Sequence, residues 1–222
     1  MCKHRILVMC ISVFLFGIIP SCGKKEKPTA PTPASSVAAR TSLSRERLLA
    51  DADVQKAVAS QSQIATDETL ERLAHRGWKR LTDDQLFQRV TIRRKLLSST
   101  DITTCAAVVR DKATEAQTLA VLAKLDPTEV ETFFSLKEIA ALAEVKNQQP
   151  PKMILQEQFP SAFDALLGTL PPDQAEHLGT LLTGDPARAS DEDICWAEKT
   201  FLDALLSVHE PYRSTLARAV VQ

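Results

Sequence analysis

The sequence has few of the residues that β-structure and the common catalytic motifs require. Glycine accounts for 6 of the 222 residues, and aromatic residues make up 5% of the chain. No Gly-rich phosphate loop, Gly-x-Ser-x-Gly elbow or Ser-x-x-Lys motif with its partners occurs. Stretches that alternate apolar and polar residues, as half-buried strands do, are also absent. These absences argue against a sheet-based fold and against the familiar nucleotide-binding and serine-nucleophile enzymes.

Patterns typical of metal sites are missing too. The chain contains no His-x-x-x-His, Cys-x-x-Cys or His-Glu-x-x-His motif, and His75, His177 and His209 stand alone. Its net charge of -1 gives no reason to expect nucleic acid. We therefore predict no metal, no cofactor, no nucleic-acid partner and no enzymatic activity. Carboxylate pairs that only folding brings together remain open, because sequence does not reveal them.

What the sequence does contain favours helices. Apolar residues make up 44% of the chain, and Ala and Leu are abundant. Helix starts are marked by Thr82 with Gln85, by Asp126 with Pro127 and Glu129, and by Ser190 with Asp193. We predict one irregular all-α domain of about 8–10 helices over residues 42–222.

Two further helices are predicted near the start of that domain. Residues 45–60 place Leu48, Leu49 and Val58 near helical spacing, which predicts one helix there. A second helix over residues 66–76 is followed by Gly77, which is typical of a helix C-cap.

The first residues of the chain have the anatomy of a secretory signal peptide. A basic start, Lys3 to Arg5, precedes an apolar run over residues 6–19. Fourteen helical residues would span about 21 Å, which is short of the roughly 30 Å hydrocarbon core of a bilayer. The run therefore favours a cleaved signal over a transmembrane helix.

Ile19-Pro20-Ser21-Cys22 resembles the lipobox of bacterial lipoproteins. The resemblance covers residues 1–22. It implies that residues 1–21 are removed as a signal peptide and that Cys22 carries lipid on its sulfur, with a further acyl chain such as palmitate on its amino group. Because Gly23 and not Asp follows the cysteine, it also implies a membrane-anchored protein of the outer membrane that faces the periplasm. The alternative is an ordinary thiol after a plain signal peptide.

The segment after Cys22 predicts a flexible tether. Residues 22–41 contain Pro28, Pro31 and Pro33 among Lys, Ser, Thr and Ala, without apolar periodicity. A coil of this length would reach about 25 Å. We therefore expect a domain that hangs from the membrane and does not lie in it.

With Cys22 assigned to lipid, Cys105 and Cys195 remain in the mature chain. An exported protein enters an oxidising compartment, so we predict a disulfide between them. In the chain-entropy model such a bond would stabilise the fold by about 4 kcal/mol. Two separate buried thiols are the alternative.

Charge is unevenly distributed along the chain. Residues 41–100 carry 11 basic and 8 acidic side chains, whereas residues 101–222 carry 10 basic and 19 acidic ones. We favour solvated helix faces of opposite sign that pair within the fold. The sharper alternative is a bipolar surface that orients a partner.

The basic residues cluster around one tryptophan, Trp78, which lies in the sequence RGWKR. An exposed aromatic ring among arginines has the composition of an interaction hot spot, although it could equally close a corner between two helices. Trp196 is expected to lie in or near the core. The candidate interaction surface consists of Arg76, Trp78, Lys79, Arg80, Arg89, Arg93 and Arg94.

These features together predict a lipid-anchored protein of the cell envelope that acts by protein–protein interaction. Its partners would be the membrane, through lipid on Cys22, and an envelope protein that it serves as adaptor, assembly factor or inhibitor. Two alternatives remain open: an envelope enzyme with carboxylate or thiol chemistry, and a structural spacer.

Overall fold

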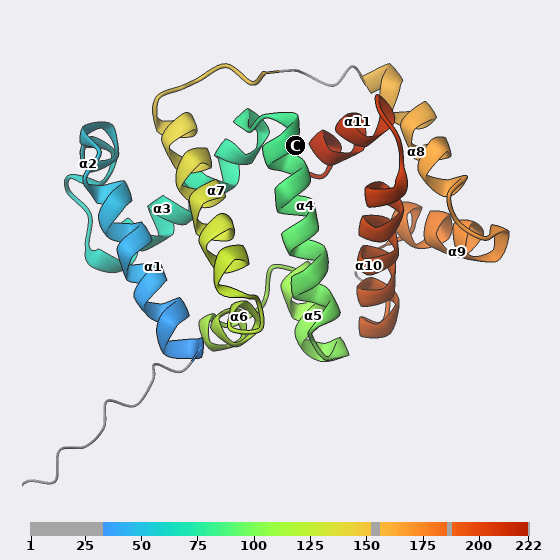
Figure 1. Cartoon of the computed structure of the whole chain (residues 1–222), viewed down its shortest axis with the longest axis horizontal. Helices are drawn as coiled ribbons and strands as arrows, with labels where there is room; N and C mark the ends of the chain where they lie inside the picture. Colours follow the sequence, from blue (N-terminus) through green and yellow to red (C-terminus); the bar gives the residue numbers. More distant parts are fainter. Residues whose placement is uncertain (1–32, 152–155, 186–187, 222) are drawn as a thin grey trace, which may run out of the picture. The chain divides into compact units, whose positions relative to one another are not determined.

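Helix follows helix along the whole described chain. The computed structural model describes residues 33–151, 156–185 and 188–221. These residues form eleven α-helices and two short 3₁₀ helices, with no β-strand among them, which confirms the predicted single all-α domain. In chain order (Figure 1) the helices are α1 Pro33–Leu49, α2 Ala52–Val58, α3 Gln63–Gly77, η1 Trp78–Arg80, α4 Asp83–Ser98, α5 Ile102–Val109, α6 Glu115–Leu122, α7 Pro127–Val145, η2 Gln156–Gln158, α8 Phe159–Leu167, α9 Pro172–Thr183, α10 Asp191–Ser207 and α11 Tyr212–Ala219.

Capping residues fix where several of these helices begin. Thr82 accepts a hydrogen bond from the Gln85 backbone, and the Gln85 side chain accepts one from the Thr82 N–H, so the predicted capping box is confirmed. Asp126 and Glu129 form the same arrangement at the start of α7. Ser190 caps α10, as predicted, by accepting from the backbone N–H of Asp193.

The helical domain begins earlier than the sequence predicted. Helix α1 starts at Pro33, so residues 33–41 belong to the domain and not to the tether. The reason is packing that leaves little trace in composition: Val37 is 1% exposed and Arg40 is 8% exposed. Arg40 donates to Glu131 at 2.5 Å and to Glu138 at 2.8 Å, which holds α1 against α7. The buried side chains of Val37 and Arg40 therefore attach the first turns of α1 to the domain, although this segment shows no apolar periodicity.

The predicted helix over residues 45–60 is divided in two. Helix α1 ends at Leu49, and α2 starts at Ala52. The carboxylate of Asp51 accepts hydrogen bonds from the backbone N–H groups of Asp53 and Val54, so it acts as an N-cap. Because Asp51 caps a new helix, one continuous apolar pattern is divided between two helices.

Helices α3 and α7 cross with their backbones in close contact. A Cβ atom placed on Gly77 would lie 1.8 Å from the carbonyl oxygen of Ala140. Gly77 is the last residue of α3, with a φ angle of -76° that is an ordinary right-handed value, and Trp78 is the C-cap, so the predicted C-cap at Gly77 is wrong. Glycine is required here because the neighbouring backbone leaves no room for a side chain.

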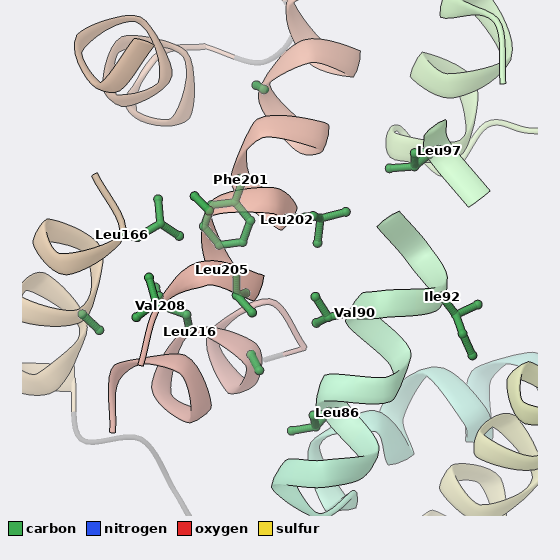
Figure 2. Packing of buried hydrophobic residues seen from close by; sticks show 14 of the residues in the cluster. Leu86, Val90, Ile92, Leu97, Leu166, Phe201, Leu202, Leu205, Val208 and Leu216 are labelled. Atoms are coloured by element: carbon green, nitrogen blue, oxygen red, sulfur yellow. The ribbon is translucent and has the colours of Figure 1, made fainter. Parts of the chain in front are cut away.

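Among the described residues, three groups of buried apolar side chains form the core. The largest joins α4 and α5 to α8–α11. Figure 2 shows Leu86 and Val90 of α4 directed toward Leu202 and Leu205 of α10. Each of these leucines is at most 1% exposed, and full burial of such a side chain stabilises a fold by about 1.5–3 kcal/mol.

Helix α7 contributes to every one of these groups. Its Ala140 belongs to the largest, its Ala141 to the one shared with α1–α3, and its Phe134 to the one shared with α1 and α6. Helix α7 therefore links the three groups of the core. None of the described helices is both long enough and apolar enough to cross a membrane.

Candidate interaction surfaces

The predicted basic surface lies at the corner formed by η1 and the adjoining helix α4. Trp78 is half-buried and packs against the largest core group. The guanidinium of Arg89 lies over its ring, 4.7 Å from the ring centroid. Trp78 therefore closes the corner between α3 and α4 and offers only part of its surface to a partner.

Three arginines of this surface bind carboxylates of the chain itself. Arg80 donates to Glu144 of α7 at 2.6 Å, and Arg93 donates to Glu198 of α10 at 2.6 Å. Arg94 forms a bidentate ion pair with Asp203 of α10. The predicted pairing of opposite charges within the fold is confirmed for these three arginines. Because each one forms an ion pair with a carboxylate of another helix, its charge is less available to a partner protein.

The other cations of the corner lack such partners. Arg76 and Lys79 are exposed and have no ion pair within the described residues. The pKa of Arg89 is lowered to about 10, mainly by burial and to a smaller extent by the nearby positive charge of Arg93. Arg89 therefore remains protonated at neutral pH. The surface available to a partner at this corner is therefore Arg76, Lys79 and the exposed edge of the stack of Arg89 on Trp78.

A second surface, of the opposite charge, lies between α9 and α10. Both helices begin with carboxylates: Asp173 in the first turn of α9, and Asp191, Glu192 and Asp193 in the first turn of α10. Asp191 pairs with Arg110, which also donates to the carbonyl of Ala189 at 2.9 Å. Within the described ranges, neither Asp173 nor Glu192 has an ion-pair partner.

Three of these carboxylates, those of Asp173, Glu192 and Asp193, line an open cavity of about 450 Å³ together with an aromatic pair. Its lining consists of Asp173, Gln174, His177, Glu192, Asp193 and Trp196. The rings of His177 and Trp196 are in contact, with centroids 4.6 Å apart. The Nε2 atom of His177 lies 3.7 Å from an Asp193 oxygen. We call this the acidic cavity.

A second cavity, of about 430 Å³, adjoins it. Most of its wall is aliphatic, and we call it the aliphatic cavity; its apolar lining is Val109, Leu181, Leu182, Ala189, Ile194 and Ala197. Asp193 lines both cavities, so they lie side by side along α10. Arg110, Lys112 and Glu198 are its remaining charged residues, and two of these, Arg110 and Glu198, are already paired within the fold.

The predicted cysteine pair holds α10 in place beside these cavities. The sulfur atoms of Cys105 in α5 and Cys195 in α10 are 1.99 Å apart, and the Cα atoms are 5.6 Å apart, which is the geometry of a disulfide. Cys195 lies between Ile194, which lines the aliphatic cavity, and Trp196, which lines the acidic one. The link therefore fixes the wall that the two cavities share.

The sequence prediction did not include Asp173, Glu192 and Trp196 as functional residues. Asp173 and His177 are four positions apart on α9, and Glu192 and Trp196 are four apart on α10, so each pair lies on one helix face. That spacing was the available signal. What could not be read from sequence is that the two faces meet.

Groups outside the two cavities have a pKa shifted from its ordinary value: Arg40, Asp51, Arg89, Asp101, Glu131, Lys146 and Glu210. No cluster of metal-ligating side chains occurs within residues 33–151, 156–185 and 188–221. Cys22 lies outside those residues, so its lipidation remains a prediction from the lipobox.

Comparisons with protein-family models, with curated protein sequences and with solved structures yield no match.

Proposed function

We propose that this is an exported, lipid-anchored protein of the cell envelope that acts by capturing a protein partner at the surface between α9 and α10. Two parts of the chain support the proposal. The lipobox at Cys22 supports export and anchoring, with the outer membrane facing the periplasm as its place. The helical domain supplies a surface that a polypeptide can dock on.

The observation that carries the binding role is the pair of adjoining cavities. Each has a volume of about 430–450 Å³, within the size range of ligand sites in proteins. One is lined by aliphatic side chains, and the other by carboxylates and aromatic rings. A surface that combines apolar, aromatic and charged groups in adjacent depressions suits successive side chains of one polypeptide.

The experiment is affinity capture of the full-length lipoprotein from detergent-solubilised membranes, followed by identification and purification of the captured protein. Gln174→Trp would fill the acidic cavity without changing its charge, because Gln174 is exposed and lines it. Gln88→Trp, at an exposed glutamine of α4, is the matched control. We expect the purified partner to bind at least about tenfold more weakly to the Gln174 variant, since filling a docking site costs about 1.4 kcal/mol or more.

The basic corner is the competing surface, and it is tested in the same assay. Arg76→Glu together with Lys79→Glu reverses its free charges without breaking an internal ion pair. If that variant loses the partner while Gln174→Trp retains it, the partner docks at the corner and the proposed surface is wrong. A Cys22→Ser variant that still fractionates with membranes and still incorporates labelled palmitate would contradict the lipid anchor.

A further inference from the structure

The charge of the acidic cavity is not balanced by the chain. Its lining contains three carboxylates and no lysine or arginine. The N-termini of α9 and α10 each contribute about half a positive charge, which leaves an excess of about two negative charges. Asp193 is also held by the Ser190 hydroxyl, which donates to it at 2.8 Å. Asp173 and Glu192 remain free to accept hydrogen bonds from a bound group.

Elsewhere on α10, the chain shows what such carboxylates bind. Asp191 pairs with Arg110, Glu198 with Arg93, and Asp203 with Arg94. Along one helix, three carboxylates thus accept guanidinium groups supplied by α4 and by the end of α5. Glu192 has no equivalent arginine within the described residues, although it faces a cavity large enough for one.

The aromatic wall adds a second kind of complementarity. The ring of Trp196 is partly exposed in the cavity, beside His177. A planar guanidinium can stack on an indole while its N–H groups point outward toward carboxylates. The fold already contains the first part of this arrangement once, where the guanidinium of Arg89 lies over the ring of Trp78, 4.7 Å from its centroid.

We propose that the acidic cavity receives an arginine or lysine side chain of a basic segment of the partner, held between Trp196 and the carboxylates of Asp173 and Glu192. The inference rests on the proposed binding role and specifies the partner's chemistry. The aliphatic cavity beside it takes an apolar side chain of the same segment. The segment therefore combines basic and aliphatic residues.

The probe is a short fluorescein-labelled peptide of alternating leucine and arginine, titrated into the full-length lipoprotein in neutral detergent and followed by fluorescence anisotropy. Asp173→Asn together with Glu192→Gln removes the free carboxylates and leaves Asp193 and its cap intact. Glu46→Gln together with Glu68→Gln removes the same charge from exposed residues of α1 and α3 that have no ion pair within the described chain.

We expect saturable binding that weakens as salt is raised. Binding should weaken about tenfold in the cavity variant, because two exposed carboxylates that attract the arginine are lost, and should be unchanged in the control variant. With ¹⁵N-labelled tryptophan, the indole signal of Trp196 should shift on peptide addition, and that of Trp78 should not. Circular dichroism of each variant confirms that it is folded.

Equal binding by the cavity and control variants would overturn the proposal. So would equal binding of a peptide with glutamate in place of arginine, or no saturable binding at all. If the captured partner still depends on Gln174 while the arginine peptide does not bind, the partner's chemistry is wrong and the docking surface stands. If the Gln174→Trp variant binds the captured partner as tightly as the parent protein does, the proposed function itself is wrong.

Discussion

Replacing Gly77 with alanine should destabilise the protein strongly, although alanine is the better helix former. The backbone angles of Gly77 suit alanine, and the exchange alone would favour folding by about 0.5–1 kcal/mol. The new Cβ, however, would lie 1.8 Å from the Ala140 carbonyl oxygen. To restore ordinary contact, α3 and α7 must separate by about 1.5 Å, and close-packed helices do not give that distance without losing contacts.

The expected net cost is about 3 kcal/mol, at the upper end of the range for overpacking, because the obstacle is backbone and not a side chain that can rotate away. With a urea m-value of about 2 kcal/mol/M, the unfolding midpoint should fall by about 1.5 M. Far-UV circular dichroism of the purified protein in a urea series measures it.

Gly179→Ala supplies the matched control with the opposite sign. A Cβ at Gly179, in the middle of α9, would meet nothing within 4 Å. That variant should gain about 0.5–1 kcal/mol. If Gly77→Ala unfolds at the same urea concentration as the parent while Gly179→Ala is stabilised, glycine does not set the distance between α3 and α7, and the reasoning is wrong.

Two further predictions concern the links between helices. Replacing Cys105 and Cys195 together with alanine should lower the free energy of unfolding by about 4 kcal/mol, since the bond joins residues 90 positions apart; a urea midpoint that is the same with and without reductant would contradict this. The hydrogen bond from Arg40 holds the pKa of Glu131 below its ordinary value of 4.5. The unfolded chain therefore takes up the proton first, and stability present above that value is lost as the pH falls through the folded-state pKa. Arg40→Met should flatten this part of the stability–pH profile, measured as urea midpoints in acidic buffers; an unchanged slope would show that the pair plays no part.

Sequence motifs whose contacts lie within one helical turn predicted the local structure correctly. Thr82 with Gln85 and Asp126 with Glu129 form the predicted capping boxes because such bonds depend only on nearby residues. The pairing of Cys105 with Cys195 was predicted because the lipobox interpretation leaves these two cysteines to pair, and the structure brings them to bonding distance.

What escaped prediction depends on contacts between distant segments. Gly77 was interpreted as a cap because nothing near it in sequence reveals Ala140 of α7. The early start of α1 depends on Arg40 reaching carboxylates about a hundred positions away. The acidic cavity exists because α9 and α10 turn Asp173 and Glu192 toward the same space. A pattern of residues fixes a helix face, but only packing decides what that face meets.

The participation of α7 in all three core groups limits how the sequence can diverge. A substitution at Ala140 alters the crossing with Gly77 as well as the largest core group, and its neighbour Ala141 faces the group shared with α1–α3. A change on this helix therefore affects more than one group of the core, because α7 contributes buried residues to all three. Among related proteins, α7 should be the most slowly changing segment, and the exposed residues around the two cavities should vary with the partner.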